Sequence, residues 1–288
     1  MKSRSSPRRR NLTQKWGFIF LRLVAIIAVL PIIAIIIFII YQGAPAISFE
    51  FIFGFPSDGM RSGGIWPAIV GTFFLTLLCA LVVSPLGIGA AIYLAEYAPD
   101  NRWTQTIRIA IISLAGIPSV VYGLFGLGLF VIFLNFGISI LAGSLTLAIM
   151  TLPVIITTTE EALRAVPQSF RVVSRSVGAT QWQTIRRIIL PQALPGILTG
   201  VILGLERAAG ETAPILFTAA VFFLPRLPSS ALDPTMALPY HLYVISTQVP
   251  GMKSEIQYGT ALVLLIFVLG MNLIATIIRS RARARRQW

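Results

Sequence analysis

Three charged residues lie within six positions of an otherwise apolar stretch, residues 197–224. They are Glu206, Arg207 and Glu211, and Thr212 follows directly. An arginine binds an oxyanion through two parallel N–H donors and keeps its charge throughout the physiological pH range. On a helix, Arg207 and Glu211 share a face, because they are four residues apart, whereas Glu206 points about 100° away. We therefore predict a polar site, with the capacity to bind an anion, inside this stretch.

The surroundings of these charges limit what the site can be. A charge at the centre of a membrane helix costs about 2.5–3.5 kcal/mol even on insertion scales, so these side chains must face a cavity, a partner or each other. Glu206, Arg207 and Glu211 together carry a charge of −1, which would repel an anion. An anion site therefore needs further cations from a second subunit, or neutralised carboxylates. The alternative is an internal ion pair that only holds helices together.

The composition predicts an all-α integral membrane protein. Of the 288 residues, 56% are hydrophobic and 11% are charged, whereas roughly a quarter of the residues in a soluble domain are charged. A membrane-spanning helix needs about 20 apolar residues. Six runs meet this need, near residues 17–41, 66–95, 108–134, 138–159, 193–224 and 259–278. We thus expect one six-helix transmembrane domain over residues 17–278, with the site in its fifth span.

The positive charges predict the orientation of these spans, because Lys and Arg near the spans stay on the cytoplasmic side. In the predicted arrangement, 19 of the 23 Lys and Arg residues fall on one side. Only Arg61, Arg226 and Lys253 fall on the other. We therefore expect cytoplasmic termini, comprising a basic segment 1–16 and a basic tail 279–288. Residues 225–258 are expected to form an extracytoplasmic loop.

Several other classes of function find no support in the sequence. The formal charge of +13 is explained by topology and contacts with anionic lipids, rather than by a nucleic-acid partner. The single Cys79 and single His241 exclude a disulfide framework and a histidine-rich metal site. None of the three lysines lies in a phosphate-cradling G-x-x-x-x-G-K-[ST] loop. We expect no catalytic residues, metal or cofactor in this chain.

The segment between the fourth and fifth spans, residues 160–192, has the pattern of an amphipathic helix pair. Arginines alternate with apolar residues at helical spacing: Val172, Val173, Val177, Trp182, Ile185, Ile188 and Ile189. Gly178-Ala179-Thr180 interrupts the pattern, which predicts two short helices joined at a glycine turn. From periodicity alone, the apolar side could pack on a partner protein or on the membrane surface.

A motif in this segment resembles the coupling loop of ABC-importer permeases. Gly178 is followed, after nine residues, by Ile188-Ile189-Leu190-Pro191, as in the family's G-x9-I-x-L-P core. The resemblance implies that the loop docks on an ATPase subunit. It also implies the candidate contacts Ser174, Arg175, Gly178, Ala179, Thr180 and Trp182. The sequence departs from the family at the Glu-Ala-Ala position, which is occupied by Val172-Val173-Ser174, so the acidic contact is absent there.

Three further strings resemble the phosphate permeases of this family. They are Arg207 to Pro214 (R-x-A-G-E-T-A-P), Gly116 to Gly126 and Ala90 to Tyr97. The resemblance, closest to the A-type subunit, implies the MetI-like bundle of type I ABC importer permeases in a bacterial inner membrane. It also implies that Arg207, Glu211, Thr212 and Glu206 lie on a translocation pathway.

The same resemblance implies several partners. These are ATP-hydrolysing ABC subunits, a second, C-type permease and an extracytoplasmic phosphate-binding protein, so ATP would be hydrolysed by a partner. Two alternatives remain open. One is a permease for another oxyanion, such as sulfate or molybdate, or for a small solute. The other, disfavoured by the coupling-loop motif, is a secondary transporter driven by ion gradients.

Overall fold

A computed structural model describes residues 7–284, except the side chains of residues 7–13, 15 and 282–284. The described part is a helical bundle. Its elements are α1 (Pro7–Gly43), α2 (Phe49–Phe53), β1 (Pro56–Ser57), β2 (Ser62–Gly63), α3 (Trp66–Ile92), α4 (Arg102–Ala115), α5 (Ser119–Gly126), α6 (Ile140–Arg164), α7 (Gln168–Ser176), α8 (Gln181–Thr184), α9 (Leu190–Gly210), α10 (Ala213–Thr218), α11 (Leu238–Thr247) and α12 (Ser254–Ala284). Three π-helical turns extend these helices, at Tyr93–Tyr97, Leu127–Phe133 and Ile185–Ile189.

Within the described residues, five continuous helical segments are long and apolar enough to cross a membrane. They are Trp16–Ala46, Trp66–Tyr97, Ile140–Arg164, Gln181–Gly210 and Ser254–Arg281. A bent pair, Arg102–Ala115 and Ser119–Phe133, makes a sixth candidate. The prediction of an all-helical membrane protein is therefore confirmed, although one of its six spans is not straight.

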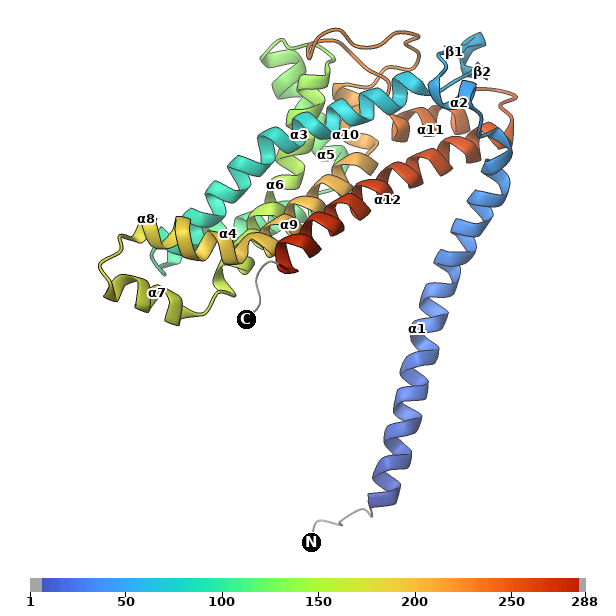
Figure 1. Cartoon of the computed structure of the whole chain (residues 1–288). Helices are drawn as coiled ribbons and strands as arrows, with labels where there is room; N and C mark the ends of the chain where they lie inside the picture. Colours follow the sequence, from blue (N-terminus) through green and yellow to red (C-terminus); the bar gives the residue numbers. More distant parts are fainter. Residues whose placement is uncertain (1–6, 285–288) are drawn as a thin grey trace.

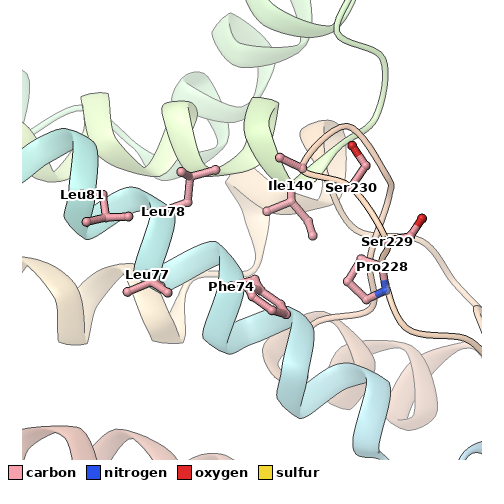
Figure 2. Close-up of a pocket in the computed structure, with 9 residues that line it drawn as sticks. Phe74, Leu77, Leu78, Leu81, Ile140, Pro228, Ser229 and Ser230 are labelled. Atoms are coloured by element: carbon pink, nitrogen blue, oxygen red, sulfur yellow. The ribbon is translucent and has the colours of Figure 1, made fainter.

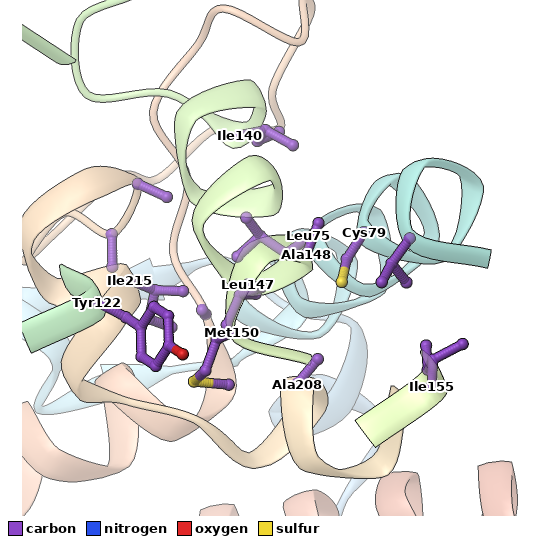
Figure 3. Close-up of a cluster of buried hydrophobic side chains, with 14 residues drawn as sticks. Leu75, Cys79, Tyr122, Ile140, Leu147, Ala148, Met150, Ile155, Ala208 and Ile215 are labelled. Carbon is purple, nitrogen blue, oxygen red and sulfur yellow. The ribbon is translucent and has the colours of Figure 1, made fainter. Parts of the chain in front are cut away.

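Helix α6 forms the centre of the bundle, between α3 and α9. In its most apolar window 67% of the residues are buried, against 0% in α1. Leu147 and Met150 of α6 pack with Leu75 and Cys79 of α3 and with Ala208 of α9 (Figure 3). Cys79 is fully buried, as expected for a small apolar side chain.

Glycines allow α6 and α9 to approach closely. A methyl group added to Gly200 of α9 would collide with the side chain of Thr158 on α6, and one added to Gly196 would collide with Ala162. Small residues four positions apart bring membrane helices together in this way, because lipid itself supplies no hydrophobic force between helices. The fifth-span helix is thus fixed against the central helix below the charged site.

Helix α1 stands apart from the rest of the bundle (Figure 1). It meets α12 near its own end, where the Phe38 and Tyr258 rings make an edge contact at 5.3 Å. Gly43 lies directly against the backbone of Tyr258. Trp16 and Ile27, farther from this junction, are 69% and 68% exposed. The apolar surface of α1 is therefore left to lipid or to another subunit.

The predicted third span, residues 108–134, is bent. The chain forms α4 and then α5, and the segment that continues α5 is inclined by 99° to α4. The bend lies at Gly116–Pro118, because proline has no N–H to continue the hydrogen-bond ladder and restrains the residue before it. Helix α4 also begins earlier than expected, at Arg102, where Asn101 caps it by accepting from the Thr104 N–H at 2.9 Å.

The predicted fifth span, residues 193–224, is also corrected. Its helix begins at Gln181 and ends at Gly210. It passes the helix-disfavouring Pro191 through the π-helical turn at Ile185–Ile189, which accommodates the local loss of regular hydrogen bonding. After Gly210 the chain breaks, and α10 follows with Pro214 in its first turn, where a missing N–H costs nothing.

The two ends of the bundle differ. Helices α7 and α8 lie at one end with the last turn of α12, whereas α2, β1, β2 and α11 lie at the other (Figure 1). β1 and β2 are antiparallel, with Pro56 opposite Gly63. The predicted outer loop 225–258 contains a packed helix, α11, whose Leu238 and Val244 are buried.

Candidate functional site

The predicted polar site lies at the end of α9. Arg207 Nε is 3.5 Å from Glu211 Oε1, so the two side chains pair, although Glu211 lies just beyond the end of the helix instead of on its face. Their side chains are 38% and 18% exposed in the isolated chain. At 3.5 Å the contact is at the upper limit of a hydrogen bond. The other guanidinium donors of Arg207 remain available to a ligand.

A break in the helix positions the acidic member of this pair. Glu211 has extended backbone angles (φ −76°, ψ 137°) directly after the last residue of α9, and Thr212 precedes α10. Glu211 borders a small cavity of about 10 Å³ that is also lined by Thr72 and Thr76 of α3. This volume is about the minimum needed for one water molecule. The break therefore places a carboxylate and a hydroxyl where a regular helix would have continued.

Glu206 lies apart from the Arg207–Glu211 pair. Its Oε1 atom is buried and has no hydrogen-bond partner among the described residues. A buried carboxylate oxygen without a donor is costly. In the assembled protein, we expect it to find a donor from water, a solute or another subunit.

Tyr122 of α5 is a further neighbour of the site that sequence reasoning missed. It belongs to the buried cluster that also contains Ala208 and Ile215, which lie close to the charged site in the sequence. Its hydroxyl donates to the Leu114 carbonyl at 2.8 Å, which ties α5 to the end of α4. Tyr122 lies in the Gly116–Gly126 string noted in the sequence, and this string was the only signal that could have drawn attention to it.

A separate crevice of about 270 Å³ lies between α3 and the segment Pro228–Ala231 (Figure 2). Leu77, Leu81 and Phe74 line its α3 side, and Ser229 and Ser230 supply polar side chains along it. Among the residues that the structure describes, no charged side chain lines this crevice, so it is a poor candidate for binding an anion. The charged site at the end of α9 remains the candidate for solute binding.

The coupling-loop segment contains the predicted glycine turn. Helix α7 ends at Ser176, and Gly178 has a φ of +82°, which a glycine adopts without strain. The predicted second short helix, however, is not separate. Helix α8 continues through a π-helical turn into α9, past Pro191, so that Gln181–Gly210 is one helical segment. The second half of the loop is therefore part of the same continuous helix that carries Arg207.

Most of the six predicted ATPase contacts face outward in the isolated chain. Four of them are exposed: Arg175, Gly178, Thr180 and Trp182. Ala179 is half-buried. Ser174 is buried, and its hydroxyl is hydrogen-bonded to the Thr184 hydroxyl at 2.8 Å, so it joins α7 to α8. Docking on an ATPase stays a prediction for all six.

Two ion-pair groups at this end of the bundle were not predicted. Arg171 of α7 pairs with Glu96, at the end of α3, over 2.6 Å, and both side chains are buried. Glu160 of α6 accepts from Arg108 at 2.8 Å and from Arg164 at 3.0 Å. Glu96 and Arg171 are 75 positions apart in the chain, so sequence spacing gave no sign of their contact.

Residues 84–286 match the family described as the binding-protein-dependent transport system inner membrane component. The chain belongs to this family. It is therefore a membrane transport component, a permease of an ABC importer, and a multi-pass membrane protein. The resemblance that the coupling-loop motif suggested is confirmed at this level.

Relatives named as permeases match most of the chain. A probable ABC transporter permease, YqgI of Bacillus subtilis, is 35% identical over 280 residues, which cover 92% of this chain and 95% of that one. A probable phosphate transport system permease, PstA of Methanocaldococcus jannaschii, is 35% identical over 249 residues, or 86% and 87% of the two chains. PstA 1 of Mycobacterium tuberculosis is 36% identical over 227 residues, or 78% and 73%.

Solved structures agree on the fold. A chain of the bacterial alginate ABC transporter, in complex with an alginate pentasaccharide-bound periplasmic protein, is 18% identical with a TM-score of 0.64, and the match covers 94% of this chain and 97% of that one. A chain of the inward-facing MetNI methionine ABC transporter is 18% identical with a TM-score of 0.58, covering 76% and 94%. The predicted fold class, a type I importer permease bundle, is thus confirmed.

Proposed function

We propose that this permease is the A-type membrane subunit of an ATP-driven phosphate importer. It would form half of the translocation pathway and pair with a second, C-type permease. ATPase subunits would dock on the coupling loop, and an extracytoplasmic phosphate-binding protein would deliver the solute. The chain would catalyse no bond chemistry and would need no cofactor of its own.

The availability of Arg207 carries this proposal. Its side chain is 38% exposed, and its Nε is 3.5 Å from Glu211 Oε1. A planar fork of N–H donors fits the oxygens of phosphate bidentately. Relatives named as phosphate permeases, at about 35% identity, support phosphate as the anion. We infer that Arg207 binds the passing anion, and that Glu211 and Thr212 orient it.

The net charge of the site requires a contribution from outside this chain. Glu206 and Glu211 outweigh Arg207, and both carboxylates lie close to it in sequence. Glu206 also has a buried oxygen without a donor. We propose that cationic or donor groups of the second permease complete the site. A complete anion pathway would then exist only between two subunits.

The coupling loop supports an ATP-driven mechanism over an ion-driven one. Trp182, at 54% exposure, and Val177, at 80%, present apolar surface at the loop. Such exposed apolar surface is typical of a partner site. We propose that this end faces the cytoplasm of a bacterial cell, with the protein in the inner membrane and both termini on the cytoplasmic side, as the distribution of positive charges predicts.

The test is uptake of labelled phosphate into liposomes that hold this chain with its cognate permease, ATPase and binding protein. We expect uptake that requires ATP and is unaffected by excess sulfate. If sulfate competed with phosphate, the proposed solute would change from phosphate to a broader class of oxyanions. Uptake without ATP would contradict the importer proposal altogether.

A further inference from the structure

A buried ion pair connects the coupling loop to the end of a membrane helix. Arg171 of α7 donates to both carboxylate oxygens of Glu96, from Nη2 to Oε1 at 2.6 Å and from Nε to Oε2 at 3.2 Å. The two side chains are only 10% and 4% exposed. We propose that this pair is the mechanical joint through which movement of the coupling loop reaches the membrane helices. The proposal rests on the proposed function, because an ATPase must supply the movement.

Arg171 also hydrogen-bonds to backbone carbonyls at the end of α6. Its Nη1 donates to the Val166 carbonyl at 2.7 Å, and its Nη2 donates to the Leu163 carbonyl at 2.9 Å. All three guanidinium nitrogens are therefore hydrogen-bonded. One side chain of α7 thus holds the ends of two membrane helices, α3 and α6, which a lysine could not do in the same geometry.

The same joint includes the start of the next membrane helix. Gln181, the first residue of α8, donates from its side chain to the Glu96 carbonyl at 2.5 Å. Ser174 and Thr184 add a hydroxyl contact between α7 and α8 at 2.8 Å. The glycine turn between α7 and α8 is therefore bridged on its inner side by polar contacts.

The outer face of α7 is exposed, so a partner protein can contact it and push on it. Val172 and Val173 are 62% and 64% exposed, whereas Arg171 and Ser174 on the inner face are buried. A partner that pushes on the outer face would act through the inner face on the helices fixed to it. The loop itself has no acidic residue at the family's Glu-Ala-Ala position, where Val172-Val173-Ser174 stand. Glu96, from the end of another helix, supplies a carboxylate to the loop instead.

Two π-helical turns adjoin the joint. Glu96 lies within the turn Tyr93–Tyr97, and Gln181 precedes the turn Ile185–Ile189. Such turns are rare and occur frequently at functional sites and hinges. In this proposal, hydrogen bonds hold Arg171 and Glu96 in place. The helices on either side can bend at the π-helical turns Tyr93–Tyr97 and Ile185–Ile189.

The test compares Arg171→Lys and Glu96→Gln with a matched control, Arg164→Lys, in the complete reconstituted transporter. Arg164 also pairs with a glutamate, but within α6 and with a half-exposed side chain, so it connects no two elements. Phosphate uptake and ATP hydrolysis are measured on the same liposomes. We expect Arg171→Lys to lower uptake about tenfold and ATP hydrolysis less than about twofold, so that less phosphate enters per ATP. Arg164→Lys should leave this ratio unchanged.

Two results would overturn the proposal. The first is an unchanged ratio of phosphate to ATP in both Arg171→Lys and Glu96→Gln. The second is a parallel loss of uptake and hydrolysis, or loss of the ATPase from the purified complex, because the pair would then serve docking or folding instead of transmission.

A distance measurement tests the joint without relying on phosphate. Spin labels at Val172→Cys on α7 and at Tyr93→Cys, in the π-helical turn that follows α3, suit this purpose, because both positions are exposed and the native Cys79 is buried. We expect the same distance in the ATP-free and ATP-trapped states, and a broader distribution in Arg171→Lys. A distance that changes between states would overturn the joint. A constant distance without phosphate uptake would leave the joint standing and overturn only the proposed solute.

Discussion

Two arginine–glutamate pairs of this permease use the same chemistry for opposite purposes. Arg171 and Glu96 are 2.6 Å apart and 10% and 4% exposed. Arg207 and Glu211 are 3.5 Å apart and 38% and 18% exposed. The first pair satisfies its guanidinium within the chain, whereas the second leaves donors available. Burial and the number of internal acceptors, rather than residue type, distinguish a pair that holds helices from one that can bind a solute.

The local backbone explains the difference. Arg171 lies near two carbonyls at the end of α6, which accept from it along with Glu96. Arg207 lies in the last turn of α9, where the helix dipole favours a cation. Glu211 is already outside the helix. The Arg207 charge is thus stabilised without all its donors being used.

The strongest contrast should appear in stability. Glu96→Gln removes the charge partner of a buried arginine and should lower the free energy of unfolding by about 3 kcal/mol. Glu211→Gln, in a looser and more exposed pair, should lower it by less than about 1 kcal/mol. Denaturant titration in detergent of the two variants beside the unmodified chain measures both. Equal losses would mean that the two pairs do not differ as described.

The next contrast concerns transport. Arg207→Ala should lower ATP-dependent phosphate uptake about 100-fold, because truncating a charged hydrogen-bonding group at a binding site costs a few kcal/mol. Arg207→Lys should recover only part of this loss, since a point charge replaces a bidentate fork. Both variants should keep the unfolding free energy nearly unchanged. Normal uptake in both would remove Arg207 from the pathway.

A third contrast concerns pH, because a titrating group outside both pairs makes stability depend on pH and must be removed before the two pairs are compared at different pH values. Burial lowers the pKa of His241 to about 4, and its Nδ1 has no hydrogen-bond partner among the described residues. The folded protein therefore favours the neutral ring. The contribution of the neutral His241 ring to the free energy of unfolding is fully present above pH 6.5, the ordinary pKa, and is lost progressively as the pH falls toward 4. The loss between pH 7 and pH 5 should be about 2 kcal/mol.

Thermal unfolding at several pH values in this range tests that expectation, with His241→Leu as the comparison. The variant should lose most of the slope with pH. The same slope in both proteins would assign the pH dependence to other groups.

The sequence predicted the features that depend on local spacing. Arg207 and Glu211 pair because they are four positions apart, and the turn at Gly178 follows from its residue type. Hydropathy located the spans but not their bends, because a hydropathy window averages over the residues on both sides of Gly116–Pro118 and of the break after Gly210. The contact of Glu96 with Arg171 was beyond reach, since it depends on how distant helices pack.

The continuous helix from the coupling loop to the charged site has the geometry of a lever arm. It runs without a break from Gln181 to Gly210. At 1.5 Å per residue, Arg207 lies roughly 40 Å from its loop end. If the loop end served as a pivot, a tilt of about 10° would carry the guanidinium through about 7 Å, more than the pitch of one helical turn. A small rotation at the loop would then suffice to move a bound anion from one set of contacts to another.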